Sequence, residues 1–206
     1  MIALTYLHNF YKNKTLSNHI HLEGGTALSL FYKINRKFSN DLDFSVETLI
    51  DLRRFQQEIT KPLGIFYKAK VIDDVKICIL DSNNYTILTI DSYLAASENC
   101  QYEEVMLEGI TPCVIHSLID ILAEKLCCMI DRDTERDVYD SAKIIKSRDI
   151  SLNDLATLFE NKQKVKQDGY NTLSQFTENL YKIKQQKINW VRQGDNLNYI
   201  YKYLSN

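Results

Sequence analysis

The stretch HLEGGTALSLFYKINRKFSNDLDFSV, residues 21–46, begins near a glycine pair and a threonine and ends near two aspartates one residue apart. Alternation before the glycines predicts a strand at His19–Leu22, followed by a glycine turn. TALSLFYKI has the apolar spacing of a helix with Thr26 near its first turn, and DLDFSV alternates like a second strand. The stretch is therefore predicted to fold as a strand–turn–helix–strand unit.

The aspartates of the second strand, Asp41 and Asp43, are two residues apart, so both side chains point to the same face of the strand. Neighbouring carboxylates repel and raise each other's pKa unless a cation joins them. Mg²⁺ favours one or two protein carboxylates together with substrate phosphates. The pair thus suits a metal–nucleotide complex, although its spacing alone favours an ordinary solvated strand end.

The glycine pair, Gly24 and Gly25, permits close approach of the backbone to an anion. A helix that starts at Thr26 aims its free N–H groups and its dipole at the same anion, and the threonine hydroxyl adds a donor. Glycine turns before helices are common, so this pattern is weak alone. Combined with the aspartates, it places a phosphate site and a metal site on one unit, and the functional and ordinary interpretations are then evenly matched.

Asp91 is the candidate third carboxylate, because in YTILTIDSY it shares a strand face with Ile87 and Thr89. Near the end of that strand, it would meet the first two aspartates across a sheet. The alternative, of equal weight, is that Asp91 caps the segment that follows, Ser92–Ala96.

The rest of the chain predicts an α+β fold, a mixed β-sheet core with flanking helices (residues 1–115) followed by an all-helical part (residues 116–206). In the first part we expect helices at 2–14 and 50–63, strands within 65–74, 75–82 and 85–93, and one short strand with a connection in 100–115. In the second part we expect helices at 116–131, 136–147 and 151–163 and a helical last forty residues.

The helical part carries a second cluster of charges. Lys125, Arg132 and Arg136 lie at i, i+7 and i+11, one face of an unbroken helix, although a break is predicted before Arg136. Asp137 and Asp140 share a face of the next helix. A solvated face with weak salt bridges is the alternative. Lys125 argues against it, because a lysine inside the apolar run ILAEKLCCMI must leave the core or meet an acid or a phosphate.

Charge is unevenly distributed along the chain. The net charge is −2, so composition does not indicate a nucleic-acid binder. After residue 160, eight basic residues face three acidic ones, a difference of +5, which leaves −7 for the first 160 residues. A solvated helical face explains such a tail more readily than an RNA contact. The basic residues of the tail are Lys162, Lys164, Lys166, Lys182, Lys184, Lys187, Arg192 and Lys202.

The five cysteines are odd in number and form no CxxC, which fits a reducing cytoplasm better than a disulfide scaffold. No histidine pairs with them at the spacing of zinc ligands. The chain has no signal-peptide pattern and no apolar run long enough to cross a membrane. We therefore expect a cytoplasmic protein without a membrane partner.

Three motifs, GGTALSLFY, RKFSNDLDF and AEKLCCMIDRDTERDVYD, together resemble the AbiEii/AbiGii nucleotidyltransferase toxins of the DNA polymerase β-like superfamily. The motifs span residues 22–140 and occur in the family's order, while the last sixty residues match no motif. Arg36 is one residue farther from Ser39 than in the tightest form of the family pattern.

The resemblance implies a nucleotidyltransferase core whose active site is completed by the helical part. It implies transfer of a nucleoside monophosphate from an NTP, with Mg²⁺ or Mn²⁺, to an acceptor, which in some members is the 3′ end of a tRNA. Such proteins are toxins of toxin–antitoxin or abortive-infection systems, neutralised by a separate antitoxin.

The resemblance also assigns roles to individual residues. The phosphate-binding residues would be Gly24, Gly25, Thr26, Arg36, Ser39 and Arg132. The metal-binding residues would be Asp41, Asp43 and Asp91, the last of which would also activate the acceptor hydroxyl. Lys125 would neutralise phosphate charge, with Asp137 near the nucleotide or orienting Lys125.

Alternatives share parts of this site. The same fold could nucleotidylate a small molecule such as an antibiotic, or a protein side chain, although the basic tail favours RNA. A kinase-like phosphotransferase can bind ATP with the same groups. A non-catalytic nucleotide-binding module is a further alternative, against which the intact acidic pair argues.

Overall fold

The computed structural model describes residues 2–34, 40–64, 67–94, 100–166 and 169–206. The chain forms two compact units, residues 1–98 with 102–116 and residues 99–101 with 117–206. The predicted α+β class is confirmed, since a mixed sheet in the first unit precedes a second unit made of helices. Within the described ranges, every helix is too short or too polar to cross a membrane.

The first unit is built on a seven-stranded sheet with the order β3-β4-β5-β2-β1-β7-β6. Its two central strands are antiparallel to each other, and each has a parallel neighbour on its other side. The outer strands pair antiparallel with their neighbours. The strands are β1 (Ile20–Glu23), β2 (Asp41–Val46), β3 (Lys68–Val71), β4 (Lys76–Leu80), β5 (Thr86–Leu94), β6 (Tyr102–Leu107) and β7 (Thr111–His116).

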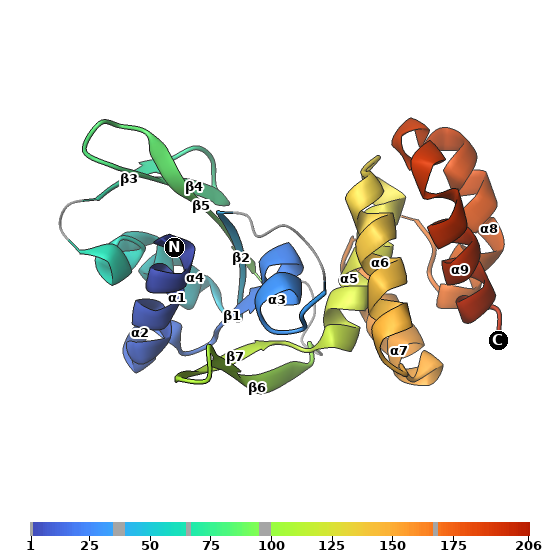
Figure 1. Ribbon diagram of the computed structural model, residues 1–206, viewed down its shortest axis with the longest axis horizontal. Helices are drawn as coiled ribbons and strands as arrows, with labels where there is room; N and C mark the ends of the chain where they lie inside the picture. The colour runs from blue at the N-terminus through green and yellow to red at the C-terminus, as the bar shows by residue number, and fades with distance from the viewer. Residues whose placement is uncertain (1, 35–39, 65–66, 95–99, 167–168) are drawn as a thin grey trace. The chain divides into compact units, whose positions relative to one another are not determined.

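An aromatic core fixes which face of the sheet is apolar. Phe10, Phe44 and Phe55 are fully buried, and their ring centroids lie 5.0–5.7 Å apart. Because Phe44 faces this core, the alternate residues of its strand, including both aspartates, point to the opposite face. Figure 1 shows α1 and α4 on one side of the central strands and α3 on the other. The helices of this unit are α1 (Ile2–Lys12), α2 (Lys14–Ser17), α3 (Gly24–Leu30), α4 (Leu49–Glu58) and the 3₁₀ helix η1 (Lys61–Leu63).

The second unit packs its helices around buried aromatic side chains. Phe159, Phe176 and Trp190 are each fully buried. Its first helix begins after Ser117, whose hydroxyl accepts the Asp120 N–H at 3.3 Å. The elements are α5 (Leu118–Asp131), α6 (Glu135–Ser147), α7 (Leu152–Lys166), α8 (Leu173–Gln186), the 3₁₀ helix η2 (Ile188–Gln193) and α9 (Gly194–Leu204).

Two sequence predictions are wrong in detail. The expected single strand in 100–115 is a hairpin of β6 and β7, whose turn contains Glu108 and Gly109 with positive φ. Pro112 lies near the start of β7, where a strand tolerates proline. The expected first helix ends at Lys12 and is followed by the separate short helix α2.

Candidate active site

The glycine pair forms the first turn of α3 directly after β1, so the predicted glycine turn between strand and helix is wrong. Gly24 has a φ of +67°, which only glycine adopts readily. A Cβ added to Gly24 would lie 2.4 Å from Oδ2 of Asp43. The missing side chain therefore lets the Asp43 carboxylate lie against the start of α3.

Thr26 joins the same helix to the neighbouring strand. Its hydroxyl donates to the backbone carbonyl of Asp41 at 2.5 Å, and the residue is 2% exposed. Its hydroxyl is thus engaged within the protein, where it fixes the start of β2 against α3. The sequence had suggested instead that this hydroxyl faces a phosphate.

The three predicted carboxylates lie on two adjacent parallel strands. Asp43 on β2 is in register with Asp91 on β5, and Asp41 is in register with Thr89. In-register neighbours and residues two apart share a face of a sheet, so all three aspartates are brought to one face. The capping alternative for Asp91 is wrong, because β5 continues through Leu94.

Asp91 has a charged partner on its other side. Lys76, the first residue of β4, is in register with Asp91, and its Nζ lies 3.4 Å from Oδ2. The other carboxylate oxygen, Oδ1, is buried and accepts no hydrogen bond from the described residues. Burial raises the pKa of Asp91, which Lys76 only partly offsets. A buried, unpartnered carboxylate oxygen beside a second carboxylate fits a bound cation.

Glu23 extends this row of charges and was missed in the sequence. It is in register with Asp43, is 8% exposed, and its Oε2 lies 3.4 Å from Nε2 of His116. His116 Nε2 is in turn hydrogen-bonded to the Ser45 hydroxyl. The alternation in HIHLE carried the signal, because Glu23 takes the same side of β1 as His21. Four carboxylates thus share this face of the sheet.

In the second unit, Lys125 of α5 meets two acids of α6. Its Nζ lies 2.9 Å from Oδ1 of Asp137 and 3.4 Å from Oδ2 of Asp140. The two aspartates are 2% and 1% exposed. The alternative of a solvated face with loose salt bridges is therefore wrong for this cluster.

Electrostatics favour the charged forms of Lys125 and Asp137 in this cluster. Burial lowers the pKa of Lys125, but the two carboxylates outweigh it and the net shift is upward. Burial raises the pKa of Asp137, but Lys125 and a 2.5 Å hydrogen bond from the Thr134 hydroxyl outweigh it, so the net shift is downward. The role of Thr134 was missed, although a threonine three residues before an acidic residue is a known sequence signature of a helix N-terminus.

The remaining predicted residues are dispersed. Arg132 ends α5 in an extended conformation and is exposed, while Arg136 lies on α6, so the two do not continue the helical face of Lys125. Arg132 still helps to lower the pKa of Asp137. Arg36 and Ser39 lie outside the described residues.

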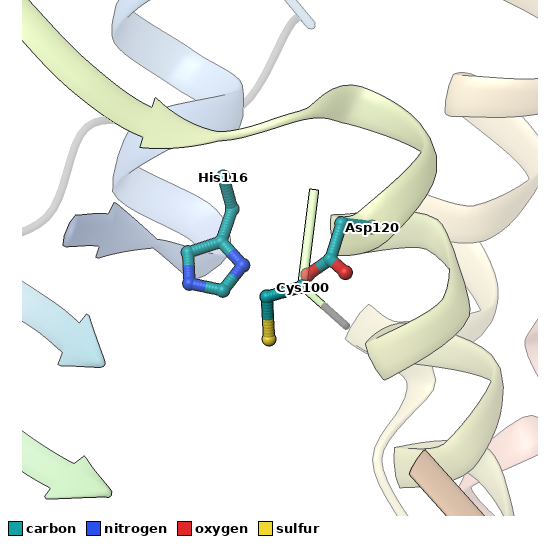
Figure 2. A group of neighbouring side chains, drawn as sticks. All are labelled: Cys100, His116 and Asp120. Carbon is teal, nitrogen blue, oxygen red and sulfur yellow. The ribbon is translucent and has the colours of Figure 1, made fainter. Parts of the chain in front are cut away.

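Figure 2 shows Cys100, His116 and Asp120, three side chains of types that bind metals. His116 belongs to the first unit, whereas the other two belong to the second. Within its own unit, Asp120 accepts a hydrogen bond from Lys162 at 3.1 Å, while His116 is bonded to Ser45. We therefore base no metal site on this group.

Comparison with known proteins agrees with the fold. The chain is 19% identical to MenT4, a nucleotidyltransferase toxin from Mycobacterium tuberculosis H37Rv, over 80% of this chain and 62% of MenT4, with a TM-score of 0.57. It is 12% identical to the antibiotic-resistance factor ANT(2'')-Ia over 76% of this chain and 88% of that one, with a TM-score of 0.52. A nucleotidyltransferase-like protein from Paracoccidioides brasiliensis is also 12% identical, over 79% and 88%, with a TM-score of 0.50. A search of curated proteins finds no match.

The sheet topology and the likeness to these solved structures define a nucleotidyltransferase fold. Residues 7–198 match the model of the nucleotidyl transferase AbiEii toxin family of type IV toxin–antitoxin systems. The chain belongs to this family. It corresponds to less than two thirds of the length of MenT4.

Proposed function

We propose that this chain transfers a nucleoside monophosphate from an NTP to an RNA acceptor, with the 3′ end of a tRNA as the leading candidate. In this proposal it acts as the toxin of a toxin–antitoxin or abortive-infection system and has a cognate antitoxin. The observation that carries the proposal is the register of Asp43 with Asp91, with Asp41 on the same face, beside the glycines that start α3.

A divalent cation, Mg²⁺ or Mn²⁺, would be held by Asp41, Asp43 and Asp91. The buried Oδ1 of Asp91, which has no hydrogen-bond partner in the described part of the chain, and the raised pKa of that carboxyl support this assignment. Hard cations of this kind prefer carboxylate oxygens. When bound, such an ion stabilises the charge that develops on the phosphate oxygens during in-line displacement.

The chain's own residues would bind the nucleotide and move the acceptor proton. The N–H groups at the start of α3, where Gly24 and Gly25 lie, would donate to the β- and γ-phosphates. Thr26 would position that turn through its bond to the Asp41 carbonyl. Asp91 would accept the proton of the acceptor hydroxyl, because a carboxyl with a raised pKa is a better base.

Lys125 would neutralise phosphate charge, and Asp137 would orient it through their 2.9 Å contact. Both are suited to these roles by being charged at neutral pH. Arg36, Ser39 and Arg132 stay candidates for further phosphate contacts. That the helical unit completes the same active site as the first unit stays a prediction.

The basic residues near the C-terminus are fewer at the surface than the sequence suggested. Lys162 is 2% exposed and pairs with Asp120, and Lys187 donates to the Ile130 carbonyl at 2.8 Å. Four others are exposed and available to RNA phosphates: Lys164, Lys182, Arg192 and Lys202. Phosphate contacts of this kind weaken steeply as salt rises.

Likeness to the antibiotic-resistance factor ANT(2'')-Ia supports a second candidate, transfer to a small molecule. Each of the four α-³²P-labelled NTPs would be incubated with the protein and, separately, with total tRNA, protein extract or an antibiotic panel. The RNA proposal predicts label on tRNA alone, which Asp43→Asn abolishes. If a small molecule or a protein is labelled while tRNA is not, that molecule rather than RNA is the acceptor.

A further inference from the structure

Lys76 lies in register with Asp91 on the strand next to it, on the same face as the aspartates. Its Nζ is 3.4 Å from Oδ2 of Asp91. The two side chains are 43% and 27% exposed, so the lysine reaches the carboxylate from the solvent side. Nothing in the sequence motifs pointed to Lys76, which lies near the start of the strand predicted within 75–82.

The arrangement divides the two oxygens of Asp91 between different environments. Oδ2 has the ammonium beside it, whereas Oδ1 is buried and has no hydrogen-bond partner among the described residues. In-register carboxylates on adjacent strands stand about 5 Å apart and repel each other, so the face needs a positive charge. The compact ammonium on its flexible stem supplies one and can swing into solvent when another cation arrives.

We propose that Lys76 is a positioning residue that serves as the internal counter-ion of Asp91 and competes with the divalent cation for that carboxylate. This inference rests on the proposed metal site. Lys76 stabilises the metal-free carboxylates and orients Asp91 by holding Oδ2. It thereby raises the divalent-ion concentration at which the site fills.

The test is direct titration of the full chain with Mn²⁺, followed by electron paramagnetic resonance of the free ion, so that no catalytic readout is needed. Lys76→Met removes the charge and Lys76→Arg retains it. Lys70→Met is the matched control, because exposed Lys70 lies on β3 in register with Cys78 rather than with an aspartate. Circular dichroism establishes that each variant is folded.

For Lys76→Met we expect a Mn²⁺ dissociation constant about five-fold lower than in the wild type, since one positive charge near a divalent ion is removed. Lys76→Arg and Lys70→Met should stay within about two-fold of the wild type. Unchanged or weaker binding by Lys76→Met overturns the inference. If Asp43→Asn binds Mn²⁺ as the wild type does, the proposed metal site itself is wrong and the role of Lys76 falls with it. If Asp43→Asn loses binding while Lys76→Met is unchanged, only the role of Lys76 is wrong.

Discussion

Replacing Gly24 by alanine tests how the start of α3 shapes the acidic site. The new Cβ would lie 2.4 Å from Oδ2 of Asp43, whereas ordinary contacts begin at 3.4 Å, so the carboxylate has to move by 1.0 Å (3.4 − 2.4). The positive φ of residue 24 adds backbone strain of roughly 1–2 kcal/mol. Rotation of the Asp43 side chain relieves the overlap, so the steric contribution lies near the lower end of overpacking costs, about 1 kcal/mol.

Gly109→Ala is the matched control. Gly109 has a φ of +72°, but no atom of the described residues lies within 4 Å of an added Cβ, so its substitution brings the same strain without the clash. We expect the free energy of unfolding to fall by roughly 1–2 kcal/mol in Gly109→Ala and by roughly 2–3 kcal/mol in Gly24→Ala, as measured by urea denaturation.

Metal binding separates the two variants more sharply. Because Gly24→Ala moves a proposed ligand, its affinity for Mn²⁺ should fall at least about ten-fold, while Gly109→Ala binds as the wild type does. In an Asp43→Ala background, Gly24→Ala should cost little more than the backbone strain, because only the Cβ of residue 43, 3.3 Å from the added Cβ, remains close. Equal metal affinity and equal stability of the two glycine variants would refute the argument that the missing Cβ makes room for Asp43.

Three further predictions concern the charged clusters. Lys125→Met removes the ammonium beside the buried Asp137 and Asp140, so we expect the free energy of unfolding to fall by about 3–5 kcal/mol in urea denaturation. Substitution of the exposed control residue, Lys164→Met, should stay within about 0.5 kcal/mol of the wild type. In the folded protein the pKa of Asp137 lies below its ordinary value of 3.8. The stabilisation that ionised Asp137 contributes is therefore present above pH 3.8 and is lost as the pH falls through the lower, folded-state pKa. In Asp137→Asn, the free energy of unfolding should fall less on acidification than in the wild type. Mg²⁺ at about 100 times its dissociation constant should add about 2.7 kcal/mol to the free energy of unfolding and raise the melting temperature by roughly 5–11 °C. A similar rise in Asp91→Asn would contradict the role of Asp91 as a ligand.

The sequence predicted the fold class and most of the elements because their periodicity is strong. Alternation placed β2 and β5, and helical spacing placed α5 and α6. The hairpin of β6 and β7 was missed because the residues around Pro112 lack clear alternation. The boundary between β1 and α3 was misplaced because a glycine with positive φ lets a helix begin without an intervening turn.

For the candidate site, spacing within one strand was enough to put Asp41 and Asp43 on one face. The alignment of Asp91 with them depends on which strands are neighbours, and local sequence does not encode that pairing. The same limit hid the register of Lys76 with Asp91 and of Glu23 with Asp43, although the alternation in HIHLE already placed Glu23 on the side of His21. Lys125 could be recognised as unusual because it interrupts an apolar helix, but its distances to Asp137 and Asp140 required the structure.

The most direct test of nucleotidyl transfer uses the same NTP labelled either at the α-phosphate or at the γ-phosphate, with total tRNA as acceptor. The proposal predicts that α-label enters the acceptor with release of pyrophosphate, that γ-label does not, and that Asp41→Asn and Asp43→Asn transfer neither. Transfer of γ-label would indicate a kinase-like reaction. Nucleotide binding without transfer of either label to tRNA, protein or small molecules would contradict the enzymatic account.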